Sequence, residues 1–416
     1  MESDVSKSHR GDTHGEGSGR KKRGALWGGL SQLVQYAVVA VITGVLVELG
    51  VYVWITRMAG EEQFLRYASY VQIYGRMQRE GRSFTKHVPH RFIGHVLSPD
   101  FQRGKNRHNA LGYRDDPIAI PKPEGEYRIV CMGGSTTYTS FVEDYKGSYP
   151  LLLQEALRGA GFAHVRVINA GTPAHSTFES LVNFEFRILD LDPDMIIIYH
   201  AVNDLMARLV WPPSAYRGDA SGSMQHSAGF FQPVRIYERS NALRMALIAL
   251  GLADSHAGLL RCFVNFPPSA QWQSFFRQYK DGTYPSGLFK RVTPQAMLNA
   301  NPPTYFRRNL EHLLVLAKYR GIQPVLCTFA LCPEKPGHNS CEAMRNGVGE
   351  HNRMIKEIGD SLQVPVFDFA ADFPNEARLF YDPDHVNARG AALKSKLIAD
   401  FLIKRGLVPR VMGGGR

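Results

Sequence analysis

Four short motifs, far apart in the sequence, hold side chains that together can break an ester. They read Gly133-Gly134-Ser135-Thr136, Asn169-Ala170-Gly171, Val202-Asn203-Asp204 and Asp382-Pro383-Asp384-His385. A serine hydroxyl is a weak nucleophile until a base takes its proton, so Ser135 would need His385. Asp382, three residues before His385, can hold the imidazole and stabilise its charged form, and Asp384 competes for that role. This set predicts nucleophilic ester hydrolysis.

Each motif also has an ordinary structural explanation when it is taken alone. A Gly-Gly-Ser turn is a common helix N-cap, and the others would pass for a loop glycine, a turn and a surface histidine. Their order and their place after successive apolar runs favour the functional interpretation. The chain has no Cys-x-x-Cys or His-Glu-x-x-His pattern, so we expect neither a zinc site nor an organic cofactor.

The motifs fall at the ends of predicted strands. Apolar runs predict strands at 128–132, 165–169, 195–199, 323–329 and 364–368, and amphipathic patterns predict helices at 148–159, 177–189, 304–320, 346–362 and 386–404. Continuous apolar strands that alternate with helices indicate a parallel sheet covered on both faces. Ligand sites in such sheets lie beyond the carboxyl ends of the strands, where Ser135, Gly171 and Asn203 are expected.

On these four motifs, over about residues 105–404, the chain resembles the SGNH/GDSL hydrolase superfamily, in particular its membrane-anchored bacterial members. The resemblance implies a flavodoxin-like three-layer α/β/α sandwich with a five-stranded parallel sheet. It implies Ser135 as nucleophile, His385 as the base with Asp382 as its carboxylate partner, and Ser135, Gly171 and Asn203 as donors of the oxyanion hole. The chain departs from the family pattern twice, with Gly-Gly-Ser-Thr for Gly-Asp-Ser-Leu and with Ala201 where a glycine is usual.

An apolar segment near the N-terminus predicts a membrane anchor. Glu48 is the only charged residue from position 24 to 56, the basic run 20–23 precedes the segment, and aromatic residues flank it. By the positive-inside rule the N-terminus is cytoplasmic and the rest lies outside a cell inner membrane, periplasmic or extracellular. A cleaved signal peptide and a buried core helix are the alternatives. Glu48 is expected near the outer edge or against a neighbouring helix.

These features divide the chain into a disordered basic tail (1–24), a transmembrane helix (25–57), a helical stalk and lead-in (58–127), a hydrolase domain (128–404) and a flexible tail (405–416). The hydrolase domain carries an irregular insertion at 205–303, either a lid or a packing embellishment. Cys332 and Cys341 flank a loop and would permit a disulfide, or they are two unrelated thiols.

The net charge of +11 suits acidic polysaccharide or anionic lipid, and no nucleic-acid motif accompanies it. We therefore expect an anchored serine esterase that removes acyl groups, chiefly acetyl, from an envelope or exported polysaccharide. Three alternatives stay open: an O-acyltransferase with the same triad, a lipid esterase or lysophospholipase, and a noncatalytic binding protein on a hydrolase scaffold. The expected partners are an acylated carbohydrate or other ester and the membrane, but no nucleic acid.

Overall fold

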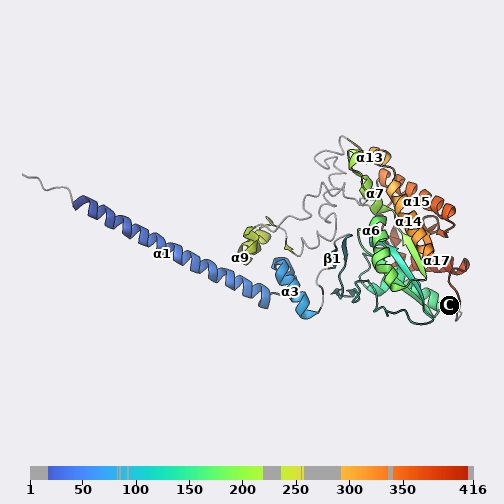
Figure 1. The fold of residues 1–416 in the computed structure, drawn as a ribbon, viewed down its shortest axis with the longest axis horizontal. Helices are drawn as coiled ribbons and strands as arrows, with labels where there is room; N and C mark the ends of the chain where they lie inside the picture. Colours follow the sequence, from blue (N-terminus) through green and yellow to red (C-terminus); the bar gives the residue numbers. More distant parts are fainter. Residues whose placement is uncertain are drawn as a thin grey trace, which may run out of the picture. The chain divides into compact units, whose positions relative to one another are not determined.

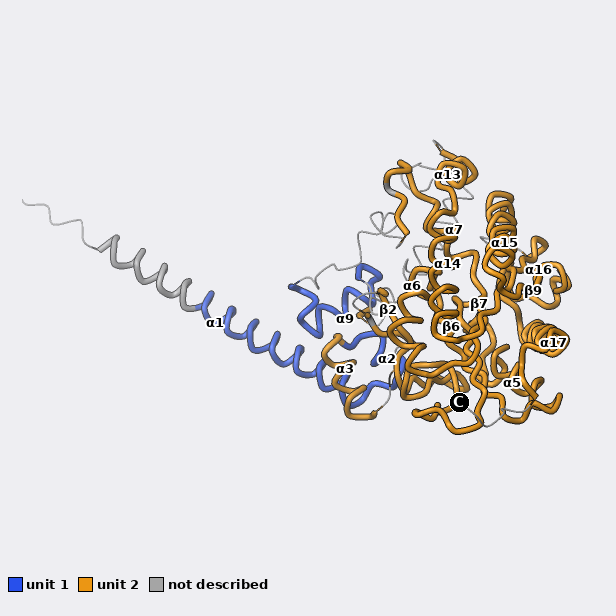
Figure 2. The backbone as a smooth tube through the Cα atoms, turned by 45° about the vertical axis from the view of Figure 1, so that its right-hand side comes forward, with its two compact units in different colours: residues 1–68, 235–253 blue, residues 69–234, 254–416 orange. Residues whose placement is uncertain are grey.

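The computed structural model describes residues 17–81, 83, 86–90, 93–218, 236–253, 255–256, 292–335 and 341–410. The chain divides into two compact units (Figure 2). Unit 1 comprises Met1–Ala68 and Arg235–Ala253, and unit 2 comprises Ser69–Val234 and Asp254–Arg416. Part of the insertion at 205–303 therefore belongs to the same unit as the N-terminal helix. The ends of the chain, 1–16 and 411–416, and the insertion residues 219–235, 254 and 257–291 lie outside the described residues.

Unit 2 is built on one five-stranded parallel sheet (Figure 1). Its strands are β5 (Tyr127–Gly133), β6 (Val165–Gly171), β7 (Met195–Tyr199), β8 (Gln323–Cys327) and β9 (Val366–Phe367). Their spatial order is β6-β5-β7-β8-β9, with every neighbouring pair parallel. Gly133 pairs with both Gly171 and Tyr199. The first three strands therefore end level with one another, and the loops that carry the predicted site residues start at one edge.

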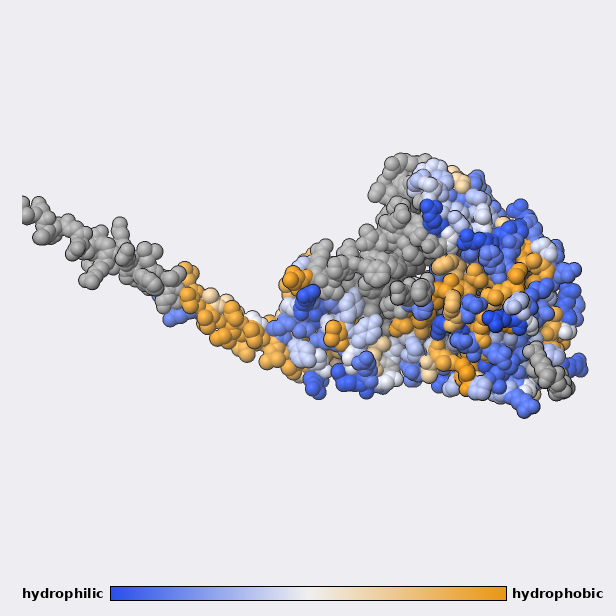
Figure 3. Space-filling view, in the orientation of Figure 1, coloured by the Kyte–Doolittle hydropathy of each residue, from blue (hydrophilic) through white to orange (hydrophobic). Residues whose placement is uncertain are grey.

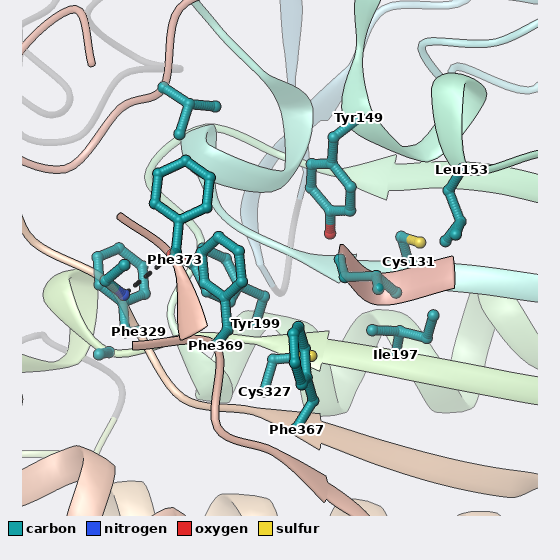
Figure 4. Packing of buried hydrophobic residues seen from close by; sticks show 14 of the residues in the cluster. Cys131, Tyr149, Leu153, Ile197, Tyr199, Cys327, Phe329, Phe367, Phe369 and Phe373 are labelled. Carbon is teal, nitrogen blue, oxygen red and sulfur yellow. Dashed lines mark hydrogen bonds between the residues drawn. The ribbon is translucent and has the colours of Figure 1, made fainter. Parts of the chain in front are cut away.

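Helices cover both faces of this sheet, as alternating strand residues require. Ile129, Cys131 and Ile197 pack with α5 (Tyr149–Gly159) and α17 (Ala388–Lys404). Val130 and Ile196 pack with α14 (Thr304–Tyr319), the π-helix η3 (Phe184–Ile188) and the later half of α15 (Glu342–Leu362). Figure 4 shows part of the first cluster, with the rings of Phe367, Phe369 and Phe373 beside Tyr199. The predicted three-layer α/β sandwich is confirmed.

The sequence places most elements well but misses several boundaries. The helix expected at 177–189 is α6 (Thr177–Asn183), continued by η3 and a short 3-10 turn, η4 (Leu189–Leu191). β9 has only two residues. The helical region expected from 58 onward consists of α2 (Glu61–Tyr67) and α3 (Tyr70–Glu80), which follow the π-helix η1 (Trp54–Met58). Ala59 is extended after η1, Ala68 is extended after α2, and Ser69 forms a capping box with Gln72 at the start of α3.

The lead-in between α3 and β5 contains two small antiparallel hairpins that the sequence did not predict. The first joins β1 (His87–His90) to β2 (Gly94–Leu97), and the second joins β3 (Gln102–Arg103) to β4 (Asn106–Arg107). These strands have at most four residues each, too few for a periodic pattern to stand out. They nevertheless add buried side chains next to the predicted site.

Unit 1 contains a long helix, α1 (Gly17–Val53), with the short helix α9 (Asn241–Ala249) beside it. Residues Gln32–Met58 are long and apolar enough to cross a membrane, and only 6% of the most apolar stretch is buried. Hydrophobic residues follow one another along the coloured part of this helix (Figure 3). A helix so exposed does not serve as a core helix, which leaves a membrane anchor or a signal sequence as its explanation.

Candidate active site

Ser135 lies at the first residue of a one-turn helix, α4 (Ser135–Tyr138), directly after β5. The two preceding glycines are required by close packing. A Cβ on Gly133 would lie 2.1 Å from Thr137 Oγ1, and one on Gly134 would lie 2.5 Å from Asn203 Nδ2. The tight turn therefore presents the hydroxyl at the carboxyl edge of the sheet, next to the loop after β7.

His385 and Asp382 complete a hydrogen-bonded relay with Ser135. The Ser135 hydroxyl lies 2.7 Å from His385 Nε2, and His385 Nδ1 lies 2.9 Å from each oxygen of the Asp382 carboxylate. Asp382 Oδ1 also accepts from the backbone N–H of His385 at 2.8 Å and of Asp384 at 3.1 Å. These bonds fix the carboxylate against the ring. The structure thus brings together three predicted residues that are up to 250 positions apart in the chain.

Asp384 is a second carboxylate at this histidine. Its Oδ2 lies 3.5 Å from His385 Nδ1, longer than the bonds from Asp382. The lengths favour Asp382 as the partner that holds the ring, with Asp384 adding negative charge nearby. Asp382, Asp384 and His385 are also the one group of metal-ligating types found in the described part of the chain. Because His385 Nδ1 is hydrogen-bonded to the Asp382 carboxylate, the arrangement of these side chains is that of a histidine–carboxylate pair.

The electrostatics of the site favour a charged imidazole. Burial alone lowers the pKa of His385, but the charge of Asp384 and the hydrogen bond and charge of Asp382 outweigh it, so the pKa lies above 6.5. Burial raises the pKa of Asp382, yet the bonds from His385 bring it below its usual 3.8. Both shifts stabilise the imidazolium–carboxylate pair that forms when the histidine takes the serine proton.

The donors around Ser135 differ in part from the prediction. The Asn203 amide donates to the carbonyl of His175 at 2.7 Å, which fixes its orientation and leaves its second N–H for a ligand. The Gly171 N–H, in contrast, already donates to Asn169 Oδ1 at 3.1 Å. A Cβ on Gly171 would lie 2.2 Å from the Tyr138 nitrogen. Gly171 therefore allows α4 to pack closely on β6, and its N–H is not free for an oxyanion.

Ala174, in the same loop, is a residue that the sequence did not reveal. Its φ is +68°, a conformation unusual for alanine. Within the described residues, no acceptor is bonded to its N–H. The next carbonyl, that of His175, lies by Gly134 and Asn203. The left-handed backbone thus turns a peptide group beside the nucleophile, and no sequence pattern signals it because the residue is not a glycine.

The lead-in hairpin β1–β2 holds this loop from outside. His95 Nε2 lies 2.8 Å from the Pro173 carbonyl oxygen, and His175 Nε2 lies 2.9 Å from the His95 carbonyl oxygen. The rings of His95 and His175 are 4.8 Å apart. Burial lowers the pKa of both rings, to about 4 for His95. Two neutral buried histidines therefore fasten residues 173–175 to a hairpin that is nearly eighty positions away in the chain.

Lys86, at the start of the same hairpin, brings a positive charge close to the catalytic histidine. Its ammonium lies 3.8 Å from the centre of the Tyr138 ring, in the helix that begins with Ser135. Burial and the nearby Arg114 lower the pKa of Lys86 to about 7. Its charge in turn opposes protonation of His385. No sequence pattern points to Lys86, because it is an isolated lysine far upstream of the four motifs.

Asp204 holds the loop of the third motif in place. Its carboxylate accepts from the backbone N–H of Thr177 at 3.1 Å and from the Thr177 hydroxyl at 2.5 Å. Burial raises its pKa to about 7. The carboxylate joins the first turn of α6 to α7 (Val202–Arg208), the helix that carries Asn203. Asp204 therefore positions the amide and does not face the reacting atoms.

A small pocket opens beside Ser135, with an empty volume of about 220 Å³ including its mouth. Tyr199, His200, Ala201 and Phe329 contribute to its wall. Ala201, which stands where the family usually has glycine, is buried, and its φ of −167° lies outside the left-handed region that favours glycine. Its carbonyl is fixed by His351 Nδ1 at 3.1 Å.

The disulfide considered between Cys332 and Cys341 is not present, because both are free thiols. Cys332 is buried in the core cluster and Cys341 caps α15, so each has a separate structural place.

Comparison with known proteins places this site in a family. The model of the GDSL-like lipase/acylhydrolase family matches residues 131–393, which contain all four motifs. Similar solved structures include a lipase/acylhydrolase from Enterococcus faecalis (15% identity, 70% of this chain and 100% of that one, TM-score 0.40). Another is an acetyl xylan esterase variant from Geobacillus stearothermophilus (13% identity, 67% of this chain and 94% of that one, TM-score 0.39). A third is a GDSL-like lipase from Bacteroides thetaiotaomicron (13% identity, 67% of this chain and 88% of that one, TM-score 0.35). No curated protein matches.

Proposed function

This chain belongs to the GDSL-like lipase/acylhydrolase family, and we propose that it is a membrane-anchored serine esterase that removes short acyl groups, chiefly acetyl, from an envelope or exported polysaccharide. The observation that carries the proposal is the continuous relay from Ser135 Oγ through His385 to Asp382, with bonds of 2.7 and 2.9 Å. A noncatalytic binding protein has no need of a base bonded to both a hydroxyl and a carboxylate.

The proposed reaction uses the relay twice. His385 Nε2 takes the Ser135 proton as Oγ attacks the ester carbonyl, and the imidazolium then gives that proton to the departing sugar oxygen. A water molecule next loses its proton to His385 and attacks the acyl-serine, which releases the carboxylic acid and restores the hydroxyl. Asp382 keeps Nδ1 protonated and stabilises the positive ring in both halves.

The negative oxygen of the tetrahedral intermediate needs preorganised donors. We assign these to the Ser135 N–H, the second N–H of the Asn203 amide and the Ala174 N–H. The hydrogen bond from the Asn203 amide to the His175 carbonyl supports Asn203 as a donor, because it holds the side chain in place before substrate arrives. The unusual backbone of Ala174 and the occupied N–H of Gly171 support Ala174 as the donor from the second motif.

Two features support a short acyl group on an anionic or hydrophilic polymer. The pocket beside Ser135 is small, and Tyr199, Ala201 and Phe329 form part of its wall, which suits an acetyl group better than a long chain. The chain has a net charge of +11, and basic surfaces attract acidic polymers. The exposed apolar helix near the N-terminus and the basic run before it support an N-terminus in the cytoplasm and a catalytic unit outside the inner membrane.

The test is release of acetate from an acetylated polysaccharide by the full-length protein in detergent or nanodiscs. We expect release with the native chain and none above background with Ser135→Ala. A parallel reaction with a large excess of a free sugar separates esterase from acyltransferase, since a transferase would form the acylated sugar faster than free acetate. Activity that rises with acyl-chain length on soluble aryl esters would instead favour a lipid esterase and contradict the small pocket.

A further inference from the structure

Glu48, the one charged side chain between Gln32 and Thr56, has a specific set of partners within unit 1. Its carboxylate accepts from the Asn241 backbone N–H at 2.6 Å, the Asn241 side-chain amide at 2.6 Å and the Ala242 N–H at 3.0 Å. It also accepts from the Ser240 hydroxyl at 2.7 Å. Glu48 of α1 therefore caps the N-terminus of α9, a helix that is 193 positions later in the chain.

These contacts matter because both partners are costly in an apolar medium. A carboxylate within a membrane span is expensive unless other groups bond to it. The first N–H groups of a helix have no partners within that helix, and in hydrocarbon each unsatisfied group costs free energy. Glu48 and the start of α9 satisfy one another, and the positive end of the helix dipole stabilises the negative charge further. The pair is therefore suited to a place that water does not reach.

The rest of this segment is also suited to lipid. From Asn241 to Ala253 the only charged residue is Arg244, and its guanidinium is buried and bonded to the carbonyls of Tyr67 and Glu238 and to the Asn241 side chain. The outward side chains are apolar: Leu250 and Leu252 are 71% and 73% exposed. An apolar groove between the two helices is lined by Val41, Val45 and Leu49 of α1 and by Leu243 and Ala246 of α9.

We propose that residues 241–252 form a second membrane-embedded segment, a short helix that lies in the outer part of the bilayer against α1, with lipid acyl chains covering its leucine face and filling the groove. Nine residues span only about 14 Å, so α9 enters the bilayer without crossing it. Glu48 lies ten residues before Met58, the end of the apolar stretch, which is about 15 Å along the helix. This depth of Glu48 in the bilayer is close to the length of α9. This inference rests on the proposed membrane span.

The consequence concerns how the catalytic unit is held. The chain passes between the two units three times, at 68–69, 234–235 and 253–254. With α9 embedded beside α1, the catalytic unit is joined to the membrane by three connections instead of a single stalk. The part of the insertion that belongs to unit 1 would thereby be held at the bilayer.

Tryptophan fluorescence in nanodiscs tests the location. Leu250→Trp places an indole at the C-cap of α9, Val41→Trp places one on α1, and Tyr319→Trp on α14 is the water-facing control. The native side chains are 71%, 65% and 84% exposed. In nanodiscs made with lipids brominated on the acyl chains, we expect the added emission of Leu250→Trp and Val41→Trp to fall by more than half and that of Tyr319→Trp to persist. Quenching of Val41→Trp without Leu250→Trp overturns this inference alone. Absence of quenching in both overturns the anchor itself, while acetate release reports separately on the esterase.

Hydrogen exchange of the full-length protein in the same nanodiscs tests the cap. Glu48→Ala removes the acceptor of the Asn241 and Ala242 amides, and we expect their exchange to become about tenfold faster or more, since bonds to charged groups are the stronger ones. Glu62→Ala, an exposed acid in the first turn of α2, is the matched control and should leave both amides unchanged. Equal exchange in the two variants would contradict the cap and with it the embedded helix.

Discussion

Replacing Gly134 with alanine tests whether the Asn203 amide stabilises the oxyanion. In the structure an added Cβ would lie 2.5 Å from Asn203 Nδ2 and 3.2 Å from the His175 carbonyl, whereas ordinary contact begins at 3.4 Å. The amide must therefore shift by about 0.9 Å to reach ordinary contact, which disturbs its hydrogen bond to the His175 carbonyl. His385 is not among the atoms nearest to the added methyl group.

The size of the effect follows from the role of the amide. Loss of one oxyanion donor costs about 10²–10³ in turnover, or about 3–4 kcal/mol of transition-state stabilisation. We expect Gly134→Ala to lower kcat for p-nitrophenyl acetate by about a hundredfold with a small change in KM. Gly349→Ala on α15, where a Cβ meets nothing within 4 Å, is the matched control and should retain full activity.

A double-mutant cycle decides between a displaced donor and a general loss of structure. Asn203→Ala should cost about as much as Gly134→Ala, and the double variant should cost little more than either, because both changes remove the same interaction. Multiplied losses in the double variant, or a Gly134→Ala enzyme within threefold of the native rate, would refute the reasoning.

The other predictions concern the relay, its pH dependence and the loop of the second motif. Ser135→Ala and His385→Ala should abolish hydrolysis of a short aryl ester while circular dichroism and the melting temperature stay near native values; full activity in either would reject the triad. Because the pKa of His385 lies above 6.5 and the base must be neutral, kcat/KM should rise with pH through a midpoint above 6.5. Lys86→Met removes a positive charge that lowers the pKa of His385, so the midpoint should move to higher pH. Lys86→Arg keeps the charge and should leave the midpoint in place. A midpoint that moves to lower pH in Lys86→Met would contradict the effect of Lys86 on His385. Ala174→Gly should keep activity and Ala174→Val should lose it, because a β-branched residue does not tolerate a φ of +68°; equal rates would remove Ala174 from the site. His95→Ala leaves the Pro173 carbonyl without its partner and should lower kcat more than it raises KM; an unchanged kcat would mean that the hairpin has no part in holding the donors.

The sequence predicted the relay because its parts are local or strand-bound. Ser135 follows an apolar strand through two glycines, and His385 lies three residues from Asp382, so short-range geometry already limits where each side chain can point. The parallel order of the strands then brings β5 and the following loops to one edge. Continuous apolar runs such as Met195–Tyr199 give the strongest strand signal, and this strand begins and ends where the pattern indicates.

The second motif shows what a sequence cannot supply. A glycine in a conserved-looking loop suggests a backbone donor, yet Gly171 is a glycine because Tyr138 packs on it. The residue that we propose as the donor in its place is an alanine with a positive φ. Nothing in the type of residue 174 predicts that conformation, which tertiary contacts from His95 and His175 maintain at a sequence separation of about 80.

Glu48 posed a choice that the sequence left open, either the outer edge of the membrane or a neighbouring helix. The structure favours the helix, but that helix comes from the insertion, 193 positions later. Amphipathicity could not reveal the pairing, because α9 is short and apolar on most of its surface. A single acid in a span was the only signal, and its partner, the start of a short helix, is recognised only when the two are seen together.

The long-range contact between the hairpin β1–β2 and the loop at residues 173–175 bears on function. The family model begins at residue 131, whereas the hairpin that fastens residues 173–175 ends at Leu97. The region that matches the family model therefore does not include the hairpin that is bonded to the loop at residues 173–175. The hairpin β1–β2 follows α2 and α3 in the chain. The polypeptide that leaves the predicted membrane span therefore continues, through these two helices, into the hairpin that is bonded to the loop at residues 173–175.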